Sequence, residues 1–139
     1  MVHALEESWR VLDTDGVLID IRPHMGNMRL EVLSDADHQL AGLVDDSVLI
    51  PDQQAANSAL KHGLNSGLFI KEEERFFDYV YIWDTPEDLK AYVDENWVNR
   101  NLQNSLYRKV RRMAAKVTGS SRIRIRDVRI IARYRKINN

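Results

Sequence analysis

A carboxylate and a guanidinium lie two positions apart in an otherwise apolar stretch of this chain. Asp20 and Arg22 occur in the segment Val17-Leu18-Ile19-Asp20-Ile21-Arg22, whose β-branched residues are typical of a strand. Alternate residues of a strand face the same side, so the two charged side chains are neighbours. A charge within an apolar strand must be paired or must serve a function. We favour a structural ion pair over a catalytic role for Asp20.

Other residue types that support catalysis or metal binding are scattered or absent. The sequence has no cysteine, which excludes a disulfide framework, a thiolate nucleophile and a thiolate metal site. The four histidines, at positions 3, 24, 38 and 62, show neither an i, i+4 pair nor a His-x-Glu arrangement. No Gly-x-Ser-x-Gly turn of a serine hydrolase occurs. The sequence therefore predicts no metal site and no catalytic residue.

Charge is distributed unevenly along a chain whose net charge is −1. Residues 1–97 hold seven basic and 20 acidic residues, a net charge of −13, whereas residues 98–139 hold 13 basic residues and one acid, Asp127, a net charge of +12. A basic C-terminal region can form a nucleic-acid-binding module. We favour the alternative that the two segments face each other, within one chain or across a dimer, because the chain as a whole is not basic.

Length and hydropathy favour one domain that has no membrane span. A chain of 139 residues, 44% of them hydrophobic, is long enough to bury a core. It contains no run of about 18 apolar residues. The first eleven residues include Glu6 and Glu7 and lack the apolar segment of a secretion signal. We expect a single domain over residues 1–139, located in the cytoplasm and not in a membrane.

Apolar periodicity and turn residues predict a mixed α/β fold. Residues 17–21 form a near-continuous apolar run, which is typical of a strand covered on both faces. Thr85-Pro86 is a strong helix start, with a capping threonine and proline at the first helical position. Side-chain alternation over residues 122–136 changes phase near Arg126-Asp127, where we expect a bulge or a tight turn. The remaining predicted helices span residues 3–12, 51 to about 63 or 66, and 101–117. We also expect a hairpin insert at about 28–46, a strand at 76–84, and a solvated loop or strand start at 71–75.

The opening helix, turn and strand resemble a motif of class I S-adenosylmethionine-dependent methyltransferases. In that family an Arg-Val-Leu sequence ends a helix, a turn of one proline and two glycines follows, and the fifth strand begins. Here Arg10-Val11-Leu12 and Gly16 match, while Thr14-Asp15 replaces the Pro-Gly part of the turn. Residues 83–89 and 131–136 also look like members of this group. The chain is thus similar to the C-terminal half of such an enzyme.

The resemblance implies an arrangement of the sheet. Residues 76–83 would be the sixth strand, and residues 122–136 would be the seventh, which inserts antiparallel between the fifth and the sixth. We therefore expect a Rossmann-like half sheet of three to five strands with an antiparallel last strand, helices packed on it and the hairpin insert.

The resemblance also implies which functional parts are missing. The family binds S-adenosylmethionine through a glycine-rich first turn and an acidic residue that ends the second strand. The six glycines of this chain, at positions 16, 26, 42, 63, 67 and 119, form no Gly-x-Gly, and the chain would begin inside the helix before the fifth strand. We expect no bound cofactor and no complete catalytic activity from this chain alone.

Two sets of residues become candidates through the resemblance. In the full enzymes, strand ends and the insert after the fifth strand border the acceptor-substrate pocket, which makes Arg22, His24, Tyr81 and Trp83 the candidate pocket residues. The alternative, core aromatics and a loop histidine, is favoured. A fifth strand without its fourth-strand neighbour exposes unpaired backbone groups. The apolar residues of this edge, which we expect to support self-association, are Val17, Leu18, Ile19 and Ile21.

Three functions follow as hypotheses. The first is a methyltransferase-related remnant or interaction module that forms a homodimer through the edge at residues 17–21 or through the faces beside it. The second is the acceptor-binding part of a split or truncated methyltransferase, which requires a separate cofactor-binding polypeptide. The third, and least favoured, is a nucleic-acid-binding module.

Overall fold

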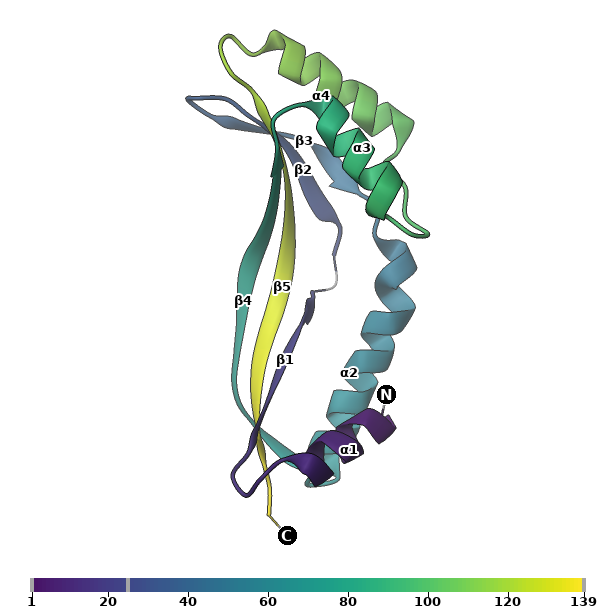
Figure 1. The fold of residues 1–139 in the computed structure, drawn as a ribbon, viewed down its shortest axis with the longest axis vertical. Helices are drawn as coiled ribbons and strands as arrows, with labels where there is room; N and C mark the ends of the chain where they lie inside the picture. Colours follow the sequence, from purple (N-terminus) through teal and green to yellow (C-terminus); the bar gives the residue numbers. More distant parts are fainter. Residues whose placement is uncertain (1, 25, 139) are drawn as a thin grey trace. The chain divides into compact units, whose positions relative to one another are not determined.

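The computed structural model describes residues 2–24 and 26–138 (Figure 1). Four α-helices, five strands and one short 3₁₀ helix follow one another in this part of the chain. None of these helices is long and apolar enough to cross a membrane. In chain order the elements are α1 (Val2–Val11), β1 (Val17–Pro23), β2 (Met28–Leu33), β3 (His38–Val44), the 3₁₀ helix (Ser47–Leu49), α2 (Ile50–Asn65), β4 (Phe69–Trp83), α3 (Pro86–Asn96), α4 (Asn104–Lys116) and β5 (Arg122–Lys136).

The long strand β5 organises the sheet. β1 pairs antiparallel with residues 129–135 of β5, and β2 pairs antiparallel with residues 122–126. β4 also pairs with β5. Its direction is antiparallel, because Leu68 accepts a backbone hydrogen bond from Ile137 while Glu72, further along, contacts Arg133. β2 and β3 form the hairpin. The predicted mixed fold, with an antiparallel last strand, packed helices and a hairpin insert, is confirmed.

The chain divides into two compact units, each with its own core. The first unit comprises residues 1–25, 49–77 and 129–139, and the second comprises residues 26–48 and 78–128. The strands β4 and β5 contribute to both units.

In the first unit α1 and α2 pack on each other and lie on one side of the sheet (Figure 1). Tyr134 and Ala132 of β5 are buried together with Phe69 of β4. Leucines of the two helices and Trp9 pack against them. Trp9 also donates a hydrogen bond from its indole nitrogen to the carbonyl of Ile137, so α1 is fixed to the end of β5 by packing and by a polar contact.

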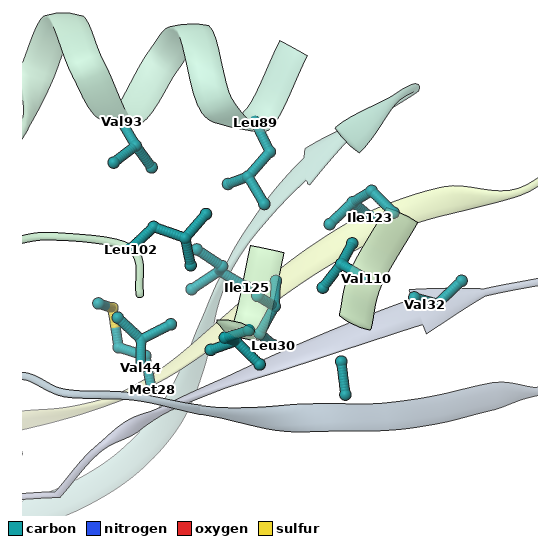
Figure 2. Close-up of a cluster of buried hydrophobic side chains, with 12 residues drawn as sticks. Met28, Leu30, Val32, Val44, Leu89, Val93, Leu102, Val110, Ile123 and Ile125 are labelled. Carbon is teal, nitrogen blue, oxygen red and sulfur yellow. The ribbon is translucent and has the colours of Figure 1, made fainter. Parts of the chain in front are cut away.

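In the second unit α3 and α4 lie over the hairpin and β5, and their apolar side chains meet those of the sheet (Figure 2). Leu89 of α3 and Val110 of α4 are completely buried. On the sheet, Leu30 lies opposite Ile125 and Val32 lies opposite Ile123. Burying a side chain of this size contributes about 1.5–3 kcal/mol, so this core holds the hairpin to the last strand.

The start of α3 follows the sequence prediction. Thr85 has an extended backbone, with φ −133° and ψ 157°, and its side chain accepts a hydrogen bond from the backbone of Asp88. Pro86 occupies the first turn. The cap satisfies a backbone donor that the helix itself leaves free.

β4 is longer than the sequence indicates. It begins at Phe69, so the charged stretch at 71–75 is part of the strand. Of the two structures that the sequence allows for this stretch, a solvated loop or a strand start, the strand is correct. Glu72 contacts Arg133 and Arg135 of β5. Such cross-strand ion pairs explain how a stretch of charged residues with little strand preference is held in the sheet.

β5 contains the predicted change of phase. Ile123, Ile125 and Asp127 are buried, and then the buried positions are Ile130, Ala132 and Tyr134. The alternation therefore shifts by one residue between Asp127 and Ile130, while the strand itself continues. Ile123 and Ile125, before the shift, belong to the core of the second unit, and Ala132 and Tyr134, after it, belong to the core of the first unit.

Candidate functional site

Asp20 and Arg22 form the ion pair expected from their spacing. Nε of Arg22 donates a hydrogen bond to Oδ2 of Asp20 over 2.8 Å, and the two side chains are 17% and 18% exposed. Asp20 lies opposite Ala132 in the register of β1 and β5, on the side of the strand that α1 and α2 cover. Since each group neutralises the other, the pair suits a structural role.

This ion pair acts on the buried Tyr134 nearby. Burial raises the pKa of the Tyr134 hydroxyl above its ordinary value of 10.0, and the negative charge of Asp20 raises it further, while Arg22 lowers it. A phenol held neutral in this way is not an activated base or nucleophile. The side of β1 that α1 and α2 cover therefore holds an ion pair and a neutral phenol, which suit a structural role in the core of the first unit.

The other edge of β1 is free. Lys136 donates a backbone hydrogen bond to Gly16, in the register that continues along β1 and β5. In an antiparallel pair alternate residues bond to the partner strand. Leu18 and Asp20 therefore direct their backbone groups toward β5, and Val17, Ile19 and Ile21 direct theirs away from it. No strand of the described chain pairs on that side.

The same three residues also point their side chains away from the helices. Ile19 and Ile21 are 49% and 56% exposed, whereas Leu18 packs against the core of the first unit. Within the described residues of the first unit, β1 is thus covered on one face, whereas the sequence predicts a strand covered on both faces. Three of the four predicted edge residues, Val17, Ile19 and Ile21, combine a free backbone edge with an apolar side chain on the uncovered side.

We call this uncovered side of the first unit its open face. It is defined by Ile19 and Ile21 of β1, Glu72 of β4, and Arg133 and Arg135 of β5. Nε of Arg133 lies 2.8 Å from Oε2 of Glu72. The hydrogen bond from Arg135 lowers the pKa of the Glu72 carboxyl, and the charges of both arginines add to that effect. Paired charges thus occupy the middle of the open face, and isoleucines lie along its β1 edge.

The sequence reasoning missed a second free edge. β4 pairs with β5 and with no other strand of the described chain. Most of its side chains are exposed, including Ile70 at 54% and Phe76 at 55%. The charged run at residues 71–75 was the signal, because lysine and glutamate on an edge strand discourage pairing with another chain. β1 carries no such charges along its free edge.

The acidic and basic segments of the chain face each other in many places, as the favoured interpretation of the charge pattern predicts. Glu31 of β2 contacts Arg124 and Arg126 of β5, and Asp78 of β4 also contacts Arg126. Arg100 contacts the buried Asp46 at 2.7 Å. These pairs lie in the second unit, and the pairs of Glu72 repeat the pattern in the first unit.

The four candidate pocket residues are distributed over the two units. Arg22 and His24 belong to the first unit, where Arg22 is paired with Asp20 and the His24 ring meets the edge of Phe76 at 4.9 Å. Tyr81 and Trp83 belong to the second unit, where their rings stack at 6.0 Å and both contact Tyr92 of α3. Each residue thus has packing or ionic partners within its own unit.

No group of three or more histidine, aspartate or glutamate side chains in the described residues is arranged to hold a metal ion. Comparisons with protein-family models, with curated proteins and with solved structures found no match.

Proposed function

We propose that this chain is a methyltransferase-related interaction module that self-associates through β1 and has no complete catalytic activity alone. The observation that carries the proposal is the free edge of β1, where Val17, Ile19 and Ile21 offer both unpaired backbone groups and apolar side chains. Unpaired edges of apolar strands are templates for pairing with another chain. The proposed location is the cytoplasm, as expected from the sequence.

The kinship with methyltransferases is part of the proposal and is supported by strand order. β5 lies between β1 and β4 and is antiparallel to β1. Because β4 is antiparallel to β5 as well, β1 and β4 are parallel to each other. This is the arrangement that the resemblance implies for the fifth, seventh and sixth strands of the family.

A second copy of the chain is the occupant that we propose for the β1 edge. A two-fold axis near Ile19 would place Ile19 of the two copies opposite each other, and Val17 opposite Ile21. On the covered side, Asp20 would then lie opposite Leu18, so no like charges would meet. Antiparallel pairing of this kind satisfies the backbone groups of both edges at once.

The mass in solution tests this proposal. We expect sedimentation equilibrium at micromolar concentration to give twice the chain mass of 16.2 kDa. Ile21→Lys should shift the protein to the monomer, because it places a charge on the paired edge. Ile70→Lys is the matched control, since Ile70 is 54% exposed, compared with 56% for Ile21, but lies on β4.

Two outcomes would contradict a dimer that forms through the β1 edge. A wild-type protein that sediments as a monomer at micromolar concentration would exclude self-association. Equal dissociation by Ile21→Lys and Ile70→Lys would show that the chains associate through another part of the surface. Circular dichroism of both variants separates loss of association from loss of fold.

The second candidate function uses the same edge differently. In the arrangement that the resemblance implies, the fourth strand of a cofactor-binding half would occupy the β1 edge, and the chain would be the acceptor-binding part of a split methyltransferase. That function predicts a monomer alone and methyl transfer after mixing with such a polypeptide. Both functions predict that calorimetry of these 139 residues with S-adenosylmethionine gives no heat. Clear binding would contradict both.

A further inference from the structure

The outer face of α4 is strongly basic. Its residues contain no aspartate or glutamate. Leu106 and Val110 are buried against the sheet, so the polar side of the helix is directed outward. The five basic residues of the helix, which we call the α4 basic face, are all exposed: Arg108, Lys109, Arg111, Arg112 and Lys116.

These charges differ from most other arginines of the C-terminal segment because they are largely not neutralised by acidic side chains. Four arginines of β5, at positions 124, 126, 133 and 135, meet Glu31, Asp78 or Glu72. On α4, the described residues supply one ion pair, between Arg111 and Glu87 at 3.1 Å. Both of its side chains are about 60% exposed, at 59% and 61%, so water weakens the attraction. The α4 basic face therefore keeps a net positive charge.

The three arginines of this face line the same depression. It is lined by Ser105, Arg108, Arg111, Arg112 and Ala115. The small side chains of Ser105 and Ala115 leave room between the guanidinium groups. Planar guanidinium groups bind phosphate oxygens in a bidentate manner, and the serine hydroxyl adds a further donor.

Other anionic surfaces fit the α4 basic face less well. A helix that binds a membrane inserts its apolar side into the lipid, but Leu106 and Val110 are already buried in the protein. A single-stranded nucleic acid is held by aromatic side chains between the cations, whereas Tyr107, the aromatic residue of α4, packs against the core of the second unit.

We infer that the α4 basic face binds the phosphate backbone of a nucleic-acid duplex without reading its sequence. From Arg108 to Lys116 the helix axis extends about 12 Å. One strand of a duplex presents a phosphate about every 3.4 Å of its axis, so several phosphates come within reach of the face. This narrows the nucleic-acid hypothesis from the whole basic segment to one helix.

Fluorescence anisotropy with a labelled DNA duplex tests the inference on the full chain. With two or three phosphate contacts, the logarithm of the association constant should fall against the logarithm of salt concentration with a slope of about −2 to −3. The double variant Arg108→Gln/Arg112→Gln should bind about tenfold more weakly or worse, and its salt slope should be shallower by about one for each arginine removed.

Matched control variants distinguish binding by the α4 basic face from a general effect of positive charge on the protein. Arg10 and Arg75 are 66% and 76% exposed and lie in the first unit. The double variant Arg10→Gln/Arg75→Gln removes the same charge and should bind the duplex as the wild type does. Glu87→Gln releases Arg111 from its ion pair and should tighten binding about twofold or threefold.

Four outcomes would overturn the inference. The first is no binding of the duplex at about 50 mM salt, and the second is an equal loss of duplex affinity in the two double variants. The third is binding of poly-glutamate as tight as that of the duplex, and the fourth is equally tight binding to vesicles that contain phosphatidylserine. The third outcome would identify an acidic protein as the partner, and the fourth would identify a membrane surface. All substituted side chains are exposed, and circular dichroism verifies that each variant is folded.

Discussion

Arg124 donates a hydrogen bond from Nε to Oε2 of Glu31 over 2.6 Å, although 93 positions separate the two residues in the chain. Arg126 donates a second one, from Nη2 to Oε1 over 2.9 Å. The Glu31 side chain is completely buried, and it joins the hairpin insert to the last strand. A buried carboxylate needs such partners, because leaving it unpaired would carry a large desolvation cost.

Glu31→Gln should destabilise the protein strongly. The substitution removes the negative charge between two arginines that are only 22% and 27% exposed. Removing one partner of a buried pair costs about 3–5 kcal/mol, and the partial exposure of the arginines favours the low end, about 3 kcal/mol. Urea denaturation measures the change. Glu7→Gln, which breaks an exposed pair with Arg10, is the control and should cost less than about 1 kcal/mol.

The ion pairs of Glu31 should also make the stability of the protein depend on pH in the acidic range. Burial favours the neutral acid, but the hydrogen bonds and charges of Arg124 and Arg126 outweigh it and hold the pKa of Glu31 below its ordinary value of 4.5. A depressed folded pKa stabilises the protein at pH values above the unfolded pKa, and this stability is lost as the pH falls through the folded pKa. Below pH 4.5 the wild type should therefore lose unfolding free energy more steeply than Glu31→Gln. Parallel curves would show that other carboxylates are responsible.

Ionisation of Tyr134 should lower the stability of the folded protein at alkaline pH. Burial and the charge of Asp20 raise the pKa of its hydroxyl above 10.0. The stability that the neutral phenol contributes is complete below the unfolded pKa and is lost as the pH rises through the folded pKa. Ultraviolet titration should show a tyrosine ionisation above pH 10.0 that is missing in Tyr134→Phe. Asp20→Asn should lower its pKa, and an unchanged titration would contradict the proximity of the two side chains.

Leu89→Ala should open a cavity in the core of the second unit. Leu89 has no exposed surface and packs with Val93, Leu102 and the sheet (Figure 2). Substitutions of this kind cost about 2–5 kcal/mol. Val98→Ala is the control, because Val98 is 78% exposed and its truncation should cost less than about 0.5 kcal/mol. Thermal denaturation compares the two, and a small loss for Leu89→Ala would show that this core rearranges to fill the space.

Much of the local structure could be predicted from the sequence because its signals lie within a few residues. The cap at Thr85, the hairpin and the pairing of Asp20 with Arg22 each depend on neighbours in the chain. The first half of β4 could not be predicted in this way. Glu72 lies in a strand because Arg133 and Arg135, more than sixty positions later, neutralise it.

The features of the candidate site are likewise of two kinds, those that local sequence predicts and those that depend on the fold. Local patterns in the sequence are enough to predict the apolar strand at residues 17–21 and to show that acidic and basic residues are segregated along the chain. The fold was needed to show that Ile19 and Ile21 face away from the helices. It was also needed to show that four arginines of β5 are paired with acids, whereas those of α4 are largely not. The reason is physical. The period of a strand is local, but burial and charge neutralisation depend on which distant segments the sheet brings together.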